Sequence, residues 1–233
     1  MNLKPRLHAI ADLVPFSRKM ADIGTDHGYL PLFLVQHGRV TSAIASDVSA
    51  GSLKKASILI DQYNMNHAIE TRLGNGLSIL SPGEAETIII AGMGAVLISE
   101  ILQKGEKVAR NATTLILQPM IGQEELRRWL IQNQYRIKDE ELVKESNRIY
   151  EIIAAVPDTE VKAYENDIYY EIAWSWIIKK HPLLKEWLVK KIRVLKEIVI
   201  NLEKGQTHSA AIQRLEAKEK LRQYEEVYHC HIR

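Results

Sequence analysis

Short aliphatic runs alternate with longer amphipathic stretches along the first 157 residues. Apolar runs of this kind are typical of parallel strands that helices cover on both faces of a sheet. We therefore predict five strands, at Met20–Ile23, Ala43–Asp47, Ile69–Leu73, Thr87–Ala91 and Thr114–Gln118. An amphipathic helix is predicted ahead of them at Leu3–Val14. The stretches between the strands predict connecting helices at Leu30–His37, Gly51–Tyr63, Ala95–Gln103 and Gly122–Gln134.

Two further strand-like runs follow, Tyr135–Val143 and Arg148–Val156. Only Lys144–Asn147 separates them, and so short a link permits only antiparallel pairing. A parallel sheet that ends in an antiparallel hairpin is the outline of a Rossmann-like class I methyltransferase fold. We expect residues 1–157 to form such an α/β domain.

After Pro157 the pattern becomes helical. Apolar residues four apart predict a helix over Val161–Lys180, and the next helix shows a seam close to that of a coiled coil, at Leu184, Leu188, Ile192, Leu195, Val199 and Leu202. The segment Gly205–Ser209 combines a helix-stopping glycine with N-cap residues. A last helix carries a stripe at Ile212, Leu215, Leu221, Tyr224 and Tyr228. We expect residues 158–233 to form a C-terminal helical hairpin or short coiled coil.

The amino-acid composition limits which classes of function the protein can have. Lys and Arg total 31 against 29 Asp and Glu, and this net charge of +2 announces no nucleic-acid partner. The single cysteine, Cys230, excludes a disulfide framework and a cysteine metal cluster. We interpret His229–His231 as an exposed tail and expect no metal site. The chain shows neither a signal peptide nor a membrane-spanning run, so we expect a protein of the reducing cytoplasm without membrane association.

One segment of this nearly neutral chain, residues 179–196, is strongly basic. Between positions 179 and 196, Glu186 is the one acidic residue among many basic ones. A solvated helix face explains such a run as well as a binding surface does. The basic residues of interest are Lys179, Lys180, Lys190, Lys191 and Arg193.

The loop after the first predicted strand places Asp22 and Asp26 around Gly24 and Thr25. Ligands of open parallel sheets bind at the carboxyl ends of the strands. The loop lacks the dinucleotide fingerprint, because Asp26 stands where a second glycine is needed and a carboxylate there repels a pyrophosphate. Two carboxylates suit an ammonium or sulfonium group, which favours S-adenosylmethionine over NAD or ATP. The alternative is a structural turn in which Asp26 caps the following helix.

The next two loops add polar groups. Asp47 ends the second strand, just before Val48, and is placed to accept hydrogen bonds from the hydroxyls of a ribose. Such aspartates are also common helix caps. After the third strand, Asn75 precedes Gly76, and its carbonyl suits the amino group of an adenine. A tight Asn-Gly turn is the alternative.

The last two loops continue the same edge. Ala91 and Gly92 end the fourth strand, where backbone carbonyls can approach a ligand and Met93 can pack on an aromatic ring. Tight packing of strand against helix is the alternative, because methionine is more often a core residue. Gln118 ends the fifth strand and adds a polar group at the rim.

Four segments, Ala21–Pro31, Gly74–Leu77, Ile90–Gly94 and Leu115–Pro119, together resemble the bacterial tRNA (adenine-N1)-methyltransferases of the TrmK type. The resemblance implies a Rossmann-like domain with a C-terminal coiled coil, and S-adenosylmethionine-dependent methylation of adenine 22 of tRNA. It places the methionine end of the cofactor near Asp22, Gly24 and Ala91, with the ribose at Asp47. The adenine then lies near Asn75 and Gly76, although Asn75 replaces the aspartate that is usual in the family.

The implied reaction assigns roles to the first loop and the basic segment. Neutral adenine already offers the lone pair of N1, so the catalyst mainly aligns the reactants and stabilises charge. We expect Asp26 to favour positive charge on the base, His27 to bond it or take a proton, and Tyr29 to stack on it. The five basic residues named above and Gln118 are expected to contact tRNA.

Two other functions remain open. The same first domain could methylate a small molecule or a protein, and the chain could be a tRNA-binding module without turnover. The sequence does not determine the oligomeric state, although a monomer is compatible with it.

Overall fold

The computed structural model describes residues 1–204 and 207–232. Contacts within the chain group its residues into two units, Met1–Glu165 and Asn166–Arg233. The division falls after the last strand, where the alternation of strands and helices has already ended.

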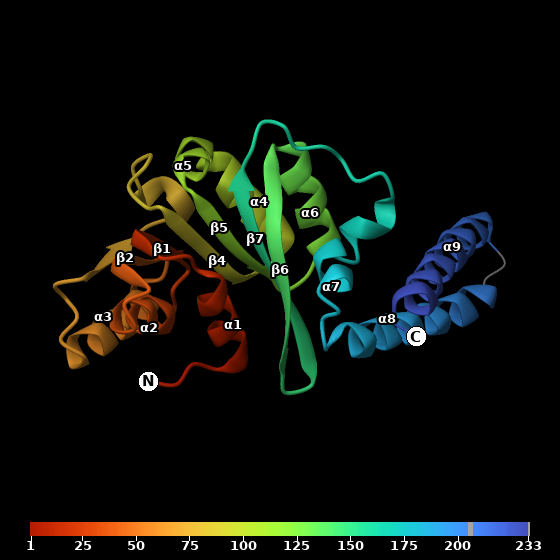
Figure 1. Cartoon of the computed structure of the whole chain (residues 1–233), viewed down its shortest axis with the longest axis horizontal. Coiled ribbons are helices and arrows are strands. Elements are labelled where there is room, and N and C mark those ends of the chain that lie inside the picture. Colours follow the sequence, from red (N-terminus) through yellow and green to blue (C-terminus); the bar gives the residue numbers. More distant parts are fainter. Residues whose placement is uncertain (205–206, 233) are drawn as a thin grey trace. The chain divides into compact units, whose positions relative to one another are not determined.

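Seven strands form one sheet in the first unit, in the order β3-β2-β1-β4-β5-β7-β6 (Figure 1). β1 to β5 are parallel, and β7 runs antiparallel to both β5 and β6. This arrangement confirms the five predicted parallel strands, the terminal hairpin and the Rossmann-like fold. The strands are β1 Ser17–Ile23, β2 Val40–Asp47, β3 Ile69–Leu73, β4 Thr87–Met93, β5 Thr114–Pro119, β6 Tyr135–Glu145 and β7 Arg148–Pro157.

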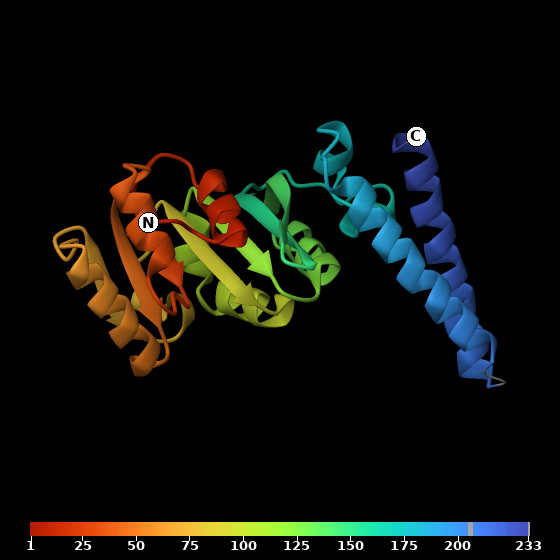
Figure 2. The ribbon, with the colours of Figure 1, turned by 90° about the horizontal axis from the view of Figure 1, so that it is seen from below.

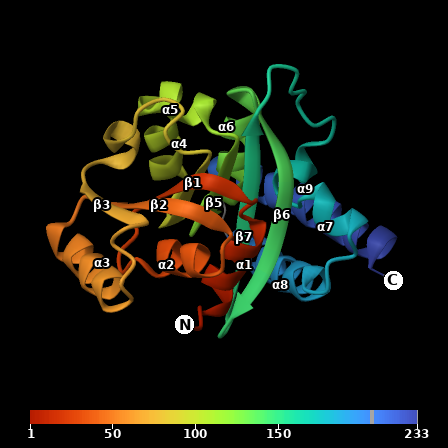
Figure 3. The same ribbon diagram turned by 60° about the vertical axis from the view of Figure 1, so that its left-hand side comes forward.

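Helices cover both faces of this sheet (Figure 3). One face carries α1 Pro5–Leu13, α2 Tyr29–Gln36 and α3 Ala50–Gln62. The other carries α4 Ala95–Lys104, α5 Glu106–Asn111 and α6 Gln123–Gln132. All of these helices except α5 were predicted, and the short helix η1 Gly76–Ile79 was also missed.

The strand pleat divides the core into two layers. Ile88 and Ile90 of β4 pack with α4 to α6, whereas Ile89 between them packs with α1 to α3. Leu115, Leu117 and Ile116 of β5 alternate in the same way. The central strands are therefore buried on both sides, which leaves their carboxyl ends as the place for a ligand.

The hairpin β6–β7 is tied to α6 by a buried ion network. The guanidinium of Arg127 is fully buried and contacts Glu140 of β6 at 2.6 Å and Glu151 of β7 at 2.7 Å. Buried charges persist only when they are paired, so this network fixes α6 on the hairpin.

The second unit is helical, with η2 Asp167–Tyr170, α7 Trp174–Ile178, α8 Leu184–Glu203 and α9 His208–His231. α8 and α9 lie side by side (Figure 2). Lys196 pairs with Glu225 at 2.7 Å and Glu203 pairs with Lys218 at 3.0 Å, so position numbers rise along one helix as they fall along the other. The pairing confirms the predicted antiparallel hairpin. Thr207 caps α9, and the predicted helix stop at Gly205 lies outside the described residues.

The predicted helix over Val161–Lys180 is wrong. This stretch holds only the short η2 and α7, because the side chain of Asn166 accepts a hydrogen bond from the N–H of Ile168 and starts a local turn instead. The four-residue spacing still marks burial, since Ile168, Ile172 and Trp176 are all buried. The cationic segment is consequently a turn followed by α8, with Lys179 and Lys180 in the turn.

Two other details of the second unit differ from the sequence prediction. Ile212 and Leu215 are 46% and 68% exposed, so the buried stripe of α9 begins further along, towards Tyr224. His229–His231 belongs to the last turns of α9 and is not a tail. Within the described ranges, no helix has both the length and the apolar composition needed to cross a membrane.

Candidate functional site

A cavity of about 740 Å³ opens at the carboxyl edge of the sheet between β1 and β4. The chain order reverses at this point, because β1 is followed by β2 on one side and pairs with β4 on the other. Such a switch point is where open parallel sheets bind ligands. Residues at the ends of β1 and β4 line one part of the cavity, and residues of the α1 segment line the rest: Asn2, Leu3, Lys4, Arg6 and Leu7.

The loop after β1 folds tightly around Gly24. This glycine has a φ of +78°, and a Cβ there would lie 2.4 Å from the methyl carbon of Met93. The N–H groups of Gly24 and Thr25 both donate to the carbonyl of Ser46. Gly28 occupies the N-cap position of α2, so the alternative of Asp26 as the cap is wrong. Asp26 has a φ of 51° and reaches the cavity.

Asp22 is a buried carboxylate on the cavity wall. Burial raises its pKa from 3.8 to about 6, and the negative charge of Asp47 adds to the rise, whereas the nearby hydroxyl of Thr25 opposes it. That hydroxyl is itself buried and lacks a partner that meets hydrogen-bond geometry. The wall therefore holds an uncompensated acid and an unsatisfied polar atom, and both fit a cationic, hydrogen-bonding ligand.

Asp26, His27 and Tyr29 form a connected group at the cavity mouth. Nδ1 of His27 lies 2.7 Å from Oδ2 of Asp26, and its ring stacks on Tyr29 with the ring centres 5.4 Å apart. This close contact favours a proton on Nδ1, and Nε2 is then the unprotonated nitrogen of the neutral imidazole. The three residues thus present a carboxylate, an imidazole and an aromatic ring together.

Asp47 joins this group through the backbone. Its Oδ2 accepts from the N–H of Asp26 at 3.2 Å, and its Oδ1 accepts from the N–H of Ser49 at 2.8 Å. Val48 beside it is 67% exposed. Asn75 and Gly76 lie beyond β3, and the strand register sets Leu73 of β3 next to Asp47. These residues extend the site along the sheet edge, outside the lining of the main cavity.

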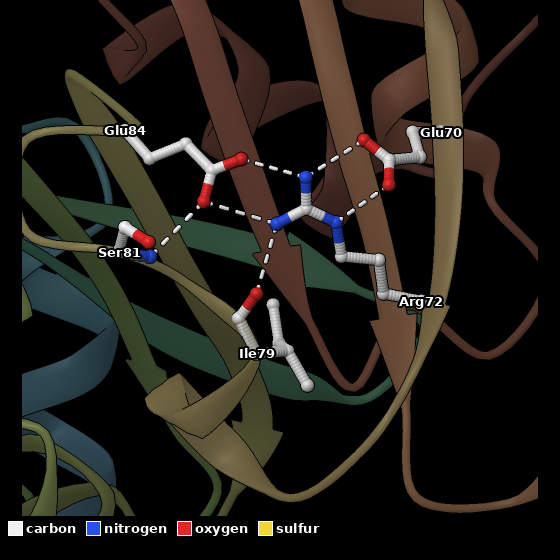
Figure 4. Close-up of polar contacts among 5 residues, drawn as sticks. All are labelled: Glu70, Arg72, Ile79, Ser81 and Glu84. Carbon is white, nitrogen blue, oxygen red and sulfur yellow. Dashed lines mark hydrogen bonds and ion pairs between the residues drawn. The ribbon is translucent and has the colours of Figure 1, made fainter.

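Arg72 holds the Asn75 loop in place (Figure 4). Its guanidinium forks onto Glu70 at 2.7 and 2.8 Å and onto Glu84 at 2.6 and 3.0 Å, and it also donates to the carbonyl of Ile79 at 2.8 Å. These contacts lower the pKa of Glu84 to about 2, and they lower that of Glu70 too. Glu84 also accepts from the N–H of Ser81. The segment that follows the Asn75 turn, from Ile79 to Glu84, is therefore fastened to one side chain of β3.

The α1 segment supplies basic groups that the sequence analysis missed. Arg6 lines the cavity, and its Nη1 donates to Oε1 of Gln118 at 2.6 Å. Its backbone N–H donates to Glu145 of β6 at 3.0 Å. Gln118, expected at the rim, is fully buried behind Arg6, and its amide donates to the carbonyl of Pro119. Lys4 adds a second positive charge to this wall.

The end of β4 is divided between the cavity and the core. Ala91 and Gly92 line the cavity, as predicted for this loop. Met93 packs with the core layer of α4 to α6 and against Gly24, so its side chain supports the loop.

The structure brings eight of the expected residues into one cavity: Asp22, Gly24, Thr25, Asp26, His27, Tyr29, Ala91 and Gly92. The five basic candidates lie in the second unit, where Nζ of Lys191 stands 4.9 Å from the ring centre of Trp187. Across residues 1–204 and 207–232, no group of three or more His, Cys, Asp or Glu side chains is arranged to hold a metal ion.

Comparison with known proteins assigns the chain to a family. A family model described as a methyltransferase domain matches residues 3–153. The tRNA (adenine(22)-N(1))-methyltransferase of Bacillus subtilis is 36% identical over 165 residues, which cover 71% of this chain and 69% of that protein. The chain belongs to the tRNA (adenine-N1)-methyltransferase family.

Solved structures of similar methyltransferases cover nearly the whole chain. The crystal structure of the Bacillus subtilis M1A22 tRNA methyltransferase TrmK matches with a TM-score of 0.86 and 28% identity, over 97% of this chain and 98% of that one. A Streptococcus pneumoniae structure in complex with S-adenosyl-L-methionine matches with a TM-score of 0.84 and 28% identity, over 95% and 97% of the two chains. The fold of this methyltransferase family thus includes the C-terminal helices.

Proposed function

We propose that this protein transfers a methyl group from S-adenosylmethionine to N1 of adenine 22 of tRNA, and that it does so in the cytoplasm. The observation that carries the proposal is the cavity at the β1–β4 switch point, whose lining combines a buried carboxylate, an exposed carboxylate and basic groups. Family membership and the similarity to a structure in complex with S-adenosyl-L-methionine support it.

The cavity residues suit the charges of S-adenosylmethionine. Asp22 would balance the positive charge of the methionine end, while Arg6 and Lys4 would attract its carboxylate. Gly24 and Gly92 line the cavity with positive φ values of +78° and +80°, a backbone conformation that glycine adopts without steric cost. Asp47 would accept from the ribose hydroxyls, with Asn75 and Gly76 beside the adenine.

The Asp26–His27 pair would manage charge on the target base. S-adenosylmethionine, when bound, supplies an electrophilic methyl group to the lone pair of N1, and positive charge then develops on the adenine ring. The carboxylate of Asp26 stabilises this charge. Nε2 of His27, oriented by Asp26, accepts a hydrogen bond or a proton from the exocyclic amino group of the methylated base. Tyr29 offers its ring to the base for stacking.

The cationic surface of the second unit would bind the tRNA backbone. A cavity of this size holds a nucleoside but not a tRNA, so phosphate contacts must come from elsewhere. Lys179, Lys180, Lys190, Lys191 and Arg193 supply positive charge for them. The target adenine must leave its stack to enter the cavity, which costs a few kcal/mol.

Mapping the modified nucleotide tests the proposal. The purified protein is incubated with S-adenosylmethionine and an unmodified tRNA transcript, and the product is analysed by nuclease digestion and mass spectrometry. We expect 1-methyladenosine at position 22, and none in a transcript that carries guanosine there.

The other outcomes separate the competing functions. Methyl transfer to a metabolite or protein pool but not to tRNA would identify a different methyltransferase. Binding of tRNA without binding of the cofactor would identify a non-catalytic module. Either result would overturn the proposal.

A further inference from the structure

A second hollow lies beside the main cavity, against α2 and α3. It has a volume of about 220 Å³ and is lined by His27, Tyr29, Lys55, Ile58, Leu59 and Gln62. His27 and Tyr29 line the main cavity as well, so their stacked rings form a wall that the two spaces share. The hollow therefore adjoins the place proposed for the target base.

The walls of this hollow combine apolar, polar and charged groups. Ile58 is 50% exposed and Tyr29 is 41% exposed, which leaves aliphatic and aromatic surface open. In the described part of the chain, neither the ammonium group of Lys55 nor the amide of Gln62 makes a hydrogen bond or an ion pair. Both groups are thus available to a ligand.

Close packing holds the hollow in shape. A Cβ at Gly28 would lie 3.1 Å from Cβ of Ala56, so the start of α2 sits directly on α3. This contact fixes Tyr29 on α2 relative to Lys55, Ile58 and Gln62 on α3. Five of the six lining side chains consequently belong to two helices in close contact, and His27 comes from the loop before α2.

We propose that this hollow binds the base of the nucleotide next to the target adenine in the substrate RNA. The base packs on Tyr29 and Ile58, Gln62 bonds its edge, and Lys55 pairs with the neighbouring phosphate. The volume suits one base and is below that of a typical cofactor pocket. The inference rests on the proposed function and adds a subsite for substrate choice to it.

A double-variant cycle between protein and RNA tests the subsite. The protein variant carries Lys55→Ala and Gln62→Ala, and the RNA variants carry an abasic residue immediately 5′ or 3′ of the target adenine. We expect the protein variant to lose about tenfold in kcat/KM for tRNA, with an unchanged Kd for S-adenosylmethionine. One of the two abasic transcripts should lose a similar factor with the unaltered protein and little more with the variant.

The control variant carries Gln103→Ala and Lys107→Ala, which removes the same two residue types from the exposed surface of α4 and α5. We expect it to match the unaltered protein with every transcript. The subsite alone would be overturned if the losses from the protein change and from the abasic residue multiplied, because the two changes would then act independently. An unchanged kcat/KM in the Lys55 and Gln62 variant would overturn it too. Failure of the unaltered protein to methylate any tRNA would overturn the proposed function, and the subsite with it.

Discussion

The burial of Asp22 is unfavourable for its carboxylate and fits the role proposed for it. Its carboxylate is buried in a wall whose other groups do not neutralise it, and its pKa is therefore raised to about 6. A cationic ligand would relieve this cost on binding. The ligand-free protein is consequently less stable than an otherwise identical chain without this charge.

We expect Asp22→Asn to stabilise the ligand-free protein. Because the folded form holds its proton more tightly than the unfolded form, ionisation of Asp22 lowers the free energy of unfolding as the pH rises from about 4 to 6. The full difference is about 3 kcal/mol above pH 7, and it shrinks towards pH 4. Urea denaturation of both proteins at pH 4, 6 and 8 measures it, and an equal difference at all three values would contradict the assignment.

The same carboxylate predicts how cofactor affinity depends on pH. Protonation of Asp22 removes the charge that attracts the cationic ligand, so the Kd for S-adenosylmethionine should rise about tenfold per pH unit below pH 6. Asp22→Asn should bind weakly with a nearly flat pH profile. Isothermal titration calorimetry from pH 5 to 8 measures both proteins, and parallel profiles would exclude Asp22 as the titrating group.

His27 gives a prediction about turnover. His27→Gln removes the imidazole that lies beside Asp26 and is proposed to act on the base, so kcat should fall about a hundredfold while the Kd values for cofactor and tRNA stay unchanged. His8→Gln is the matched control, because His8 and Asp12 form a similar pair, 3.1 Å apart, on α1. Single-turnover rates with saturating tRNA measure the effect. Weaker binding of cofactor or tRNA with an unchanged single-turnover rate would show that His27 only shapes the entrance of the cavity.

At the scale of elements, Arg72 links the stability of a loop to the shape of the site. Five hydrogen bonds from one guanidinium hold Glu70, Glu84 and the carbonyl of Ile79. A lysine offers a point charge in place of this planar fork.

We expect Arg72→Lys to loosen the loop that carries Asn75. The free energy of unfolding should fall by about 1–2 kcal/mol, and the Kd for S-adenosylmethionine should rise severalfold. Arg18→Lys on the exposed Arg18–Glu86 pair is the control and should change neither. Thermal unfolding with and without cofactor measures both effects. A loss of stability with unchanged cofactor affinity would show that the loop does not contribute to cofactor binding.

The sequence predicts those parts of the site that depend on strand order. Parallel strands bring their carboxyl ends to one edge, so the loops of Asp22, Asp47 and Ala91 were found from position alone. Arg6 was missed because helical periodicity shows which face of α1 is apolar but not which edge of the sheet its first turn reaches. Gln118 was misplaced at the rim because its position after the strand does not reveal that its side chain is fully buried and bonded to Arg6.

The second unit was harder to predict in detail. Regular spacing identified α8, where packing repeats along the helix. It failed before α7, because a capping side chain at Asn166 outweighed a helical pattern of apolar residues. Spacing also misjudged Ile212 and Leu215, since the partner face of a hairpin sets which residues are covered.

At the scale of the whole molecule, the distribution of charge determines where a large polyanionic substrate can bind. The chain is nearly neutral, but basic residues gather in the turn before α8 and along that helix. Nucleic acid binding through such groups releases counterions and weakens with salt.

We expect Lys180→Glu with Arg193→Glu to weaken tRNA binding at least about tenfold and to flatten its salt dependence. The Kd for S-adenosylmethionine should not change, because the cavity proposed for the cofactor lies within the first unit. Lys104→Glu with Lys107→Glu makes the same change of charge on α4 and α5 and serves as the control. Fluorescence anisotropy of labelled tRNA over a salt series measures the affinity of both variants. An equal loss of tRNA affinity in the two variants would show that only the net charge of the protein matters.

The aromatic residues of the second unit give the molecule an optical signature. Trp174, Trp176 and Trp187 belong to that unit, and of the chain's four tryptophans only Trp129 lies in the first. Trp176 and Trp187 meet edge to face with ring centres 5.4 Å apart, and Trp187 stacks on Tyr224 at 6.0 Å. Indole emission therefore reports chiefly on the second unit, and the melting of the Rossmann-like sheet must be followed by another signal.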